Sequence, residues 1–133
     1  MEPVIRIKGV TRSFPLADGK SAEVLKGLDM EIFPGSLVIL KGRSGSGKTT
    51  LLNILGALDY PTSGEVYLNG TDIARMNEAQ RSRIRRTSIG FVFQSVALIP
   101  ILSAYENVEF GLRTAGYPAK DRQTRAEEAL TLV

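Results

Sequence analysis

The sequence predicts an α/β fold in which an antiparallel β layer precedes a strand–loop–helix unit. Three observations predict it. Residues 5–14 and 24–33 alternate apolar and polar side chains, as half-buried strands do. Residues 37–40 are Leu-Val-Ile-Leu, which is typical of a parallel strand covered on both faces. A glycine-rich stretch at 42–47 separates that run from a helical pattern at 50–58.

The composition excludes several classes of function. The chain has 43% hydrophobic and 23% charged residues, as globular proteins do, and it contains no cysteine and no histidine. Disulfides, thiolate metal sites and imidazole acid–base chemistry are therefore excluded. The longest apolar run, 96–102, is far shorter than the roughly 20 residues that span a bilayer, and the N-terminus lacks the apolar segment of a signal peptide. We expect a cytoplasmic protein without direct membrane insertion.

The net charge of +3 does not indicate a nucleic-acid partner. Several arginines gather between residues 75 and 86, but no aromatic residue interleaves with them. They fit the polar face of a helix that begins near Asn77, so we expect this face to be solvated and no nucleic acid to bind. The clustered arginines are Arg75, Arg81, Arg83, Arg85 and Arg86.

The first two strands should pair with each other. Turn-forming residues at 15–20 separate them, and Leu28, Met30 and Ile32 share one face of the second strand. A Pro-Gly turn at 34–35 closes that strand. The two strands are therefore expected to form an antiparallel layer, distinct from the buried strand at 37–40.

Residues 42–49, Gly-Arg-Ser-Gly-Ser-Gly-Lys-Thr, match the phosphate-loop pattern G-x-x-x-x-G-K-[ST]. The glycines let the backbone curl until successive N–H groups face one anion. Lys48 is expected to meet the β- and γ-phosphates, and the Thr49 hydroxyl to ligate Mg²⁺. A plain Gly/Ser linker would not be followed at once by an apolar helix. The sequence therefore predicts a nucleoside-triphosphate site at the N-terminus of the following helix.

Helices and strands alternate after the loop. Turn-forming residues at 59–64 end the first helix, a strand is expected at 65–68 before the turn pair Asn69-Gly70, and an apolar strand is expected at 88–93. Three more helices are predicted: 77–86 with Asn77 as N-cap, 103–113 from a capping box, and, after an interruption at 116–118, one from about 119 that still continues at 133.

The β layer, the phosphate loop and an apolar strand leading to Gln94 together resemble the ATPase domain of ABC transporters. The resemblance covers nearly the whole chain from about residue 4. It is carried by residues 10–14, 25–28, 42–50, 51–56, 58–59, 61–66 and 89–94. Residues 98–100 and 102–108 look specifically like the lipoprotein-release and macrolide-export subgroup.

The resemblance implies roles for individual residues. Phe14 would stack on adenine, where the family more often has Tyr; the alternative is a core aromatic at a strand end. Lys48 and Gln94 would act on the γ-phosphate, and Thr49 and Gln94 would reach Mg²⁺. For a lone Gln, the alternative is a polar residue that ends a strand. The residues expected to hold the triphosphate are Gly42, Arg43, Ser44, Gly45, Ser46, Gly47, Lys48, Thr49 and Thr50.

The implied fold is a P-loop NTPase core of the ABC ATPase type, with an N-terminal antiparallel β layer and the start of a helical subdomain. Residues 1–133 would form one ATPase domain that is incomplete at its C-terminus, with the β layer and loop-bearing core in 1–94 and the helical subdomain beginning in 95–133. The family's signature of the Leu-Ser-Gly-Gly-Gln type, its Asp-Glu pair and its histidine do not occur here. We therefore expect the chain to bind ATP and Mg²⁺ without hydrolysing ATP alone.

The function implied is that of the ATP-binding subunit of a transporter for lipoprotein release or macrolide/peptide export. Such a subunit pairs with a second copy and with a membrane permease, to which residues 95–107 would lie close, and is peripheral on the inner face of the cell membrane. A catalytically inert ATP-binding fragment and a cell-division regulator of the same type stay open. Another P-loop class is less well supported, because the guanine motif Asn-Lys-x-Asp and the long insertion expected of a repair ATPase are both missing.

Overall fold

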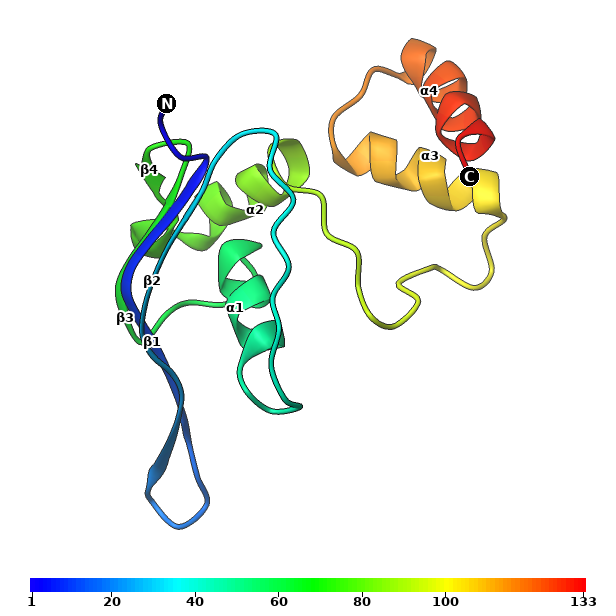
Figure 1. Ribbon diagram of the computed structural model, residues 1–133. Coiled ribbons are helices and arrows are strands. Elements are labelled where there is room, and N and C mark those ends of the chain that lie inside the picture. The colour runs from blue at the N-terminus through cyan, green and yellow to red at the C-terminus, as the bar shows by residue number, and fades with distance from the viewer. The chain divides into compact units, whose positions relative to one another are not determined.

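The computed structural model describes residues 1–133, which separate into two compact units, Met1–Arg85 and Arg86–Val133. The first unit contains the β-strands, and the second contains two helices (Figure 1). The elements in chain order are β1 (Ile5–Pro15), β2 (Ser21–Ile32), α1 (Lys48–Leu55), β3 (Ser63–Leu68), β4 (Thr71–Asp72), the 3₁₀ turn η1 (Ile73–Arg75), α2 (Glu78–Thr87), α3 (Ala104–Thr114) and α4 (Ala119–Thr131).

The first unit is built on an antiparallel sheet with the strand order β2-β1-β3-β4. The predicted pairing of the first two strands is confirmed, and Ile7 lies opposite Met30 on one side and Val66 on the other. The β1–β2 ladder extends to Pro15 and Ser21 because the Leu16 N–H donates to the Lys20 carbonyl at 2.7 Å and closes a tight turn. The second strand consequently begins three residues earlier than predicted.

The hairpin predicted at Asn69-Gly70 is also confirmed. Asn69 has φ +47° and Gly70 has φ +76°, the two left-handed positions that a two-residue turn of this kind requires. This turn joins β3 to the short edge strand β4.

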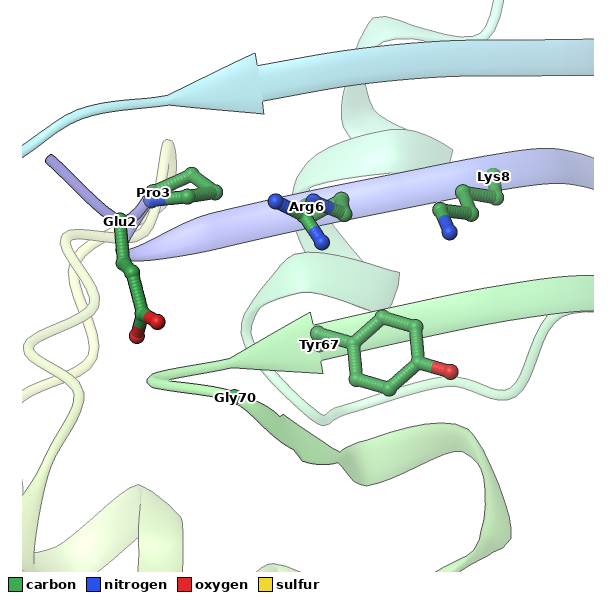
Figure 2. A pocket seen from close by; sticks show the side chains of 6 residues that line it. All are labelled: Glu2, Pro3, Arg6, Lys8, Tyr67 and Gly70. Carbon is green, nitrogen blue, oxygen red and sulfur yellow. The ribbon is translucent and has the colours of Figure 1, made fainter.

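Helices α1 and α2 lie to one side of the sheet (Figures 1 and 2). Helix α1 buries Leu51 and Ile54, and Ile7, Val10, Leu25, Val66 and Ile73 complete the core of the unit. The helix begins at Lys48, two residues earlier than predicted, and ends at Leu55 instead of 58. It ends early because Ala57 adopts a left-handed backbone with φ +55°, which a helix cannot continue through.

The N-cap predicted for α2 is present. The Asn77 side chain accepts a hydrogen bond from the Gln80 N–H, and the Gln80 side chain accepts one from the Asn77 N–H, both at 3.0 Å. These reciprocal bonds satisfy two N–H groups that an isolated helix end leaves open.

The prediction of a wholly solvated arginine face is wrong at Arg81, which is 1% exposed. Its guanidinium lies 3.7 Å from the centroid of the Tyr60 ring and donates to the carbonyl oxygens of Ile73 (3.0 Å) and Asp59 (2.5 Å). Arg85 is also half-buried and donates to the Ala57 carbonyl at 2.6 Å. The carbonyls and the ring replace part of the water that the guanidinium loses, whereas the buried Arg81 Nε has no hydrogen-bond partner and desolvation lowers the pKa of Arg81.

The two apolar strands predicted at 37–40 and 88–93 do not form. Leu37 is 89% exposed and Val92 is 96% exposed. A strand exists only when a neighbouring strand accepts and donates its backbone hydrogen bonds, and none of the four strands pairs with either segment. Apolar composition alone was therefore insufficient to predict these strands.

In the second unit, α3 and α4 pack against each other and Ala126 is buried. The predicted capping box is confirmed: the Ser103 N–H donates to the Glu106 carboxylate at 2.7 Å, and the Glu106 N–H donates to the Ser103 hydroxyl at 3.2 Å. Helix α4 ends at Thr131 and so stops two residues before the chain does, contrary to the prediction. No helix of the chain is both long enough and apolar enough to cross a membrane.

Candidate functional site

The phosphate-loop sequence leads directly into the N-terminus of α1. Gly47 is the N-cap residue of this helix and makes no side-chain capping bond, and the first turn of α1 contains no acidic residue. The N–H groups of the first turn have no partners within the helix, and the helix dipole places a partial positive charge there. This end of α1 therefore has unpaired N–H donors of the kind that bind anions.

Lys48 folds back across the loop. Its ammonium donates to the carbonyl oxygens of Gly42 at 2.6 Å and Arg43 at 2.7 Å, whereas the Ser46 hydroxyl is 3.4 Å away. An ammonium has three N–H donors, so the two short bonds hold the charge beside the loop and the third donor is weakly engaged. The third donor is available to a phosphate oxygen.

Close packing requires glycine at position 47 and leaves little space for a Cβ at Gly42, where the nearest atom is the rotatable Ser46 hydroxyl. A Cβ on Gly47 would lie 2.7 Å from Leu25 Cδ2 and 3.0 Å from Val24 Cγ1, and Gly47 has φ +97°. A Cβ on Gly42 would lie 2.5 Å from the Ser46 hydroxyl. The first approach packs the loop against β2, and the second keeps the loop tightly curled.

The other residues predicted to hold the triphosphate lie in or directly after this loop. Arg43, Ser44, Gly45, Ser46 and Thr49 are exposed, and Thr50 is half-buried in the first turn of α1. The chain contains no group of three acidic, cysteine or histidine side chains that could hold a metal ion by themselves. The hydroxyl of Thr49 is an oxygen ligand of the kind that Mg²⁺ accepts, and this ion commonly takes its remaining ligands from water and substrate phosphates.

Phe14 lies near the end of β1, and the residue is 36% exposed. It pairs with Ala22 of β2, two residues before Val24, the residue that contacts the Gly47 position. Phe14 therefore lies close in the sheet register to the strand segment that supports the loop. The structure does not place it in the buried core.

Gln94 lies in an exposed bend of the second unit. It does not end a strand, because the strand predicted at 88–93 is absent. The structure thus places Phe14, β2 and the loop within the first unit, and Gln94 belongs to the second unit.

An ion pair that the sequence did not predict lies beside Phe14. The Arg12 guanidinium lies 4.3 Å from the centroid of the Phe14 ring and forms a bidentate pair with the Asp59 carboxylate, at 2.8 and 3.0 Å. The only sequence signal was that Arg12 precedes Phe14 by two positions on one strand and so shares its face. Nothing in the sequence pattern pointed to Asp59.

A second concave region lies on the opposite face of the sheet from the helices (Figure 2). It has a volume of about 330 Å³ and is lined by Glu2, Pro3, Arg6, Lys8, Tyr67 and Gly70. Arg6 donates to Glu31 at 2.7 Å, and the Tyr67 hydroxyl donates to Glu65 at 2.9 Å, which raises the pKa of Tyr67. These groups already have partners in the sheet, so the phosphate loop remains the stronger candidate site.

Comparison with known proteins gave matches over nearly the whole chain. The family described as "ABC transporter" matches residues 25–133. An uncharacterized ABC transporter ATP-binding protein of Thermotoga maritima is 47% identical over all of this chain and 56% of its own length. The lipoprotein-releasing system ATP-binding protein LolD of Bacteroides fragilis is 45% identical over 96% of this chain and 56% of its own length.

Two further matches extend the comparison. The macrolide export ATP-binding/permease protein MacB of Marinobacter nauticus is 46% identical over 97% of this chain and 20% of its own length. Among solved structures, the dimeric ATP-binding cassette MJ0796 bound to ADP and Pi in a post-hydrolysis state has a TM-score of 0.87 and 39% identity, covering 96% of this chain and 56% of that one. The chain spans about half the length, or less, of the relatives that it matches.

Proposed function

This chain belongs to the ABC transporter family of ATP-binding proteins, and we propose on that premise that it supplies the phosphate-binding part of an ATP site. The predicted P-loop NTPase fold class is confirmed by the ATP-binding cassettes of the same fold. The observation that carries the proposal is the arrangement of Lys48, held by the Gly42 and Arg43 carbonyls beside the uncapped start of α1.

Each residue of the site has a proposed task. The backbone of residues 42–50 would bind the phosphates, and Lys48 would donate to an oxygen of the terminal phosphates. Thr49 and Gln94 would provide oxygen ligands for Mg²⁺, which neutralises phosphate charge when bound. Phe14 would stack on the adenine through an exposed ring face. The β layer and loop-bearing core would comprise 1–94, and a helical subdomain would begin in 95–133.

We propose that this chain binds ATP without hydrolysing it alone. In-line phosphoryl transfer to water needs a group that orients the water, in addition to a phosphate cradle and a metal ion. Lys48 has no acceptor oxygen and cannot take the proton of a water, and these 133 residues contain neither a hydrophobic strand ending in Asp-Glu nor a histidine. Within the ATP site, the proposed role of these residues is to bind and orient the phosphates.

The larger role that we propose is coupling of ATP binding and hydrolysis to a membrane permease. The relatives support the lipoprotein-release or macrolide-export type, because LolD belongs to a lipoprotein-releasing system and MacB is an ATP-binding/permease protein. Pairing with a second ATPase subunit is supported by the dimeric cassettes. Peripheral attachment to the inner face of the cell membrane through the permease follows from this assignment.

Binding of Mg-ATP to the purified chain, compared with the variant Lys48→Ala, tests the proposal. Loss of the charged hydrogen bonds should weaken ATP binding roughly ten- to hundredfold. Lys41→Ala is the matched control, because Lys41 is an exposed lysine immediately before the loop and should be dispensable. Equal ATP affinity of the Lys48→Ala variant and the parent chain would refute the phosphate site. Turnover that disappears in this variant would refute the claim that the chain does not hydrolyse ATP alone.

A further inference from the structure

We propose that Arg12 is a positioning residue that holds the Phe14 ring in place for base stacking, with Asp59 as its anchor. The inference rests on the proposed function, because it assumes that Phe14 receives the base. It assigns to Arg12 and Asp59 a part in recognising the base, whereas the phosphate loop recognises only the phosphates.

The contact between Arg12 and Phe14 has the geometry of a stacked cation. The guanidinium carbon lies 4.3 Å from the ring centroid, within the range of a favourable cation–π contact. Phe14 as a whole residue is 36% exposed, so the guanidinium does not enclose it. An aromatic ring has two faces, and a cation that occupies one leaves the other for a nucleotide base.

Arg12 is fixed by its own partners. The Nε and one terminal nitrogen donate to the two Asp59 oxygens at 2.8 and 3.0 Å, and the other terminal nitrogen donates to the Ser13 carbonyl at 3.2 Å. Both members of the pair are partly buried, with 23% and 28% of their side chains exposed. A bidentate fork fixes the plane of the guanidinium as well as its position, which a single bond does not do.

Asp59 is in turn a fixed anchor. Its N–H donates to the Asn53 carbonyl of α1 at 3.2 Å, its carboxylate accepts the Tyr60 N–H at 2.8 Å, and its carbonyl accepts from buried Arg81 at 2.5 Å. Two further bonds join the following segment to β1, from the Thr62 N–H to the Thr11 carbonyl (2.8 Å) and from the Ser13 N–H to the Thr62 hydroxyl (2.9 Å). Phe14 is thus connected through Arg12 and Asp59 to α1, the helix whose N-terminus carries the phosphate loop.

These contacts fix the position of the base-stacking ring relative to α1, the helix that follows the phosphate loop. A bound nucleotide must contact the ring with its base and the loop with its phosphates at the same time. A ring that already has its orientation before binding loses less conformational freedom when the base stacks. Because Asp59 neutralises the charge of Arg12, the contribution of Arg12 should act through the ring and not through attraction to the phosphates.

The test compares the affinities of Mg-ATP and Mg-tripolyphosphate, which has the same phosphates and no base. Arg12→Ala and Arg12→Lys should each weaken ATP binding roughly fivefold and leave tripolyphosphate binding unchanged. Lysine keeps the charge but loses the planar fork, and it is the milder variant for the fold. Arg6→Ala is the matched control, since Arg6 also lies on β1 and pairs with a carboxylate, Glu31, and should leave both affinities unchanged.

A double-variant cycle completes the test. In a Phe14→Leu background, Arg12→Lys should cause no further loss of ATP affinity, because the ring through which Arg12 acts is gone. Equal losses for ATP and tripolyphosphate, or a full loss that persists without Phe14, would overturn the proposal and leave the phosphate site intact. An unchanged ATP affinity of Phe14→Leu alone would overturn both this inference and the stacking role of Phe14. If the phosphate site itself is wrong, Lys48→Ala would change the affinity for neither ATP nor tripolyphosphate, and this result distinguishes the two failures.

Discussion

Replacement of Arg81 by alanine should destabilise the first unit by about 3 kcal/mol, although Arg81 belongs to a cluster that the sequence places on a solvated face. The buried guanidinium donates to the Ile73 and Asp59 carbonyls and stacks on Tyr60. Hydrogen bonds to charged groups contribute about 1.5–3 kcal/mol each, and a desolvated cation–π contact contributes about 2 kcal/mol. The alanine variant no longer buries a charge, and this gain offsets several kcal/mol of that sum. The expected net loss of stability is therefore about 3 kcal/mol.

Urea unfolding of the purified chain, followed by far-UV circular dichroism, measures this loss directly. Arg86→Ala is the matched control on the same helix, because Arg86 is exposed and its removal should change the free energy of unfolding by less than about 0.5 kcal/mol. Arg81→Lys should lose at least half as much as Arg81→Ala, since a single ammonium lacks the planar fork that reaches both carbonyls. A loss for Arg81→Ala below about 1 kcal/mol would refute the claim that these contacts stabilise the unit.

Three further outcomes follow from the structure. Gly47→Ala should abolish ATP binding and destabilise the fold, because its Cβ would collide with Leu25. Gly45 has a similar positive φ but open space around it, so Gly45→Ala should cost only about 1–3 kcal/mol of backbone strain. Equal effects of the two variants would contradict the packing argument. The hydrogen bond from the Ser103 N–H lowers the pKa of Glu106, so the capping box should stabilise α3 fully above the unfolded pKa of Glu, about 4.3, and lose that contribution as the pH falls through the lowered folded value. Amide hydrogen exchange in the first turn of α3 should then rise more steeply on acidification in the parent chain than in Glu106→Gln, and parallel profiles would contradict this. Because Leu37, Ile39, Val92 and Ile101 are largely exposed, the purified folded chain should bind an apolar dye, and absence of dye binding would count against a free apolar surface at these residues.

Local features of the fold could be predicted because their determinants are local. The hairpin strands, the Asn69-Gly70 turn, the Asn77 cap and the Ser103–Glu106 capping box each depend on residues a few positions apart. The start of a helix directly after the phosphate loop was also predicted from a local pattern. For the candidate site, the loop motif singled out the residues around Lys48 before any geometry was known, and their role in phosphate binding stays a prediction.

Features that depend on distant partners could not be predicted. The runs at 37–40 and 88–93 have strand composition, yet they lack a neighbouring strand and stay irregular. Arg81 has the composition of a surface residue, yet carbonyls from Asp59 and Ile73, 22 and 8 positions away in the sequence, accept its hydrogen bonds in the interior. Periodicity reports which face of a helix is polar, but it does not report what that face meets.

The sequence by itself determined that the chain carries a phosphate loop and which family it resembles, because a loop that must curl around an anion requires glycines and a lysine at fixed spacing. Only the tertiary structure decided how that loop is held, by the Lys48 ammonium on the Gly42 and Arg43 carbonyls and by the packing of Gly47 on β2. It also decided the contacts that run from Asp59 through Arg12 to Phe14. Arg12 and Asp59 are 47 positions apart in the chain, and their pairing depends on how β1 and the segment after α1 pack together, which no local pattern encodes.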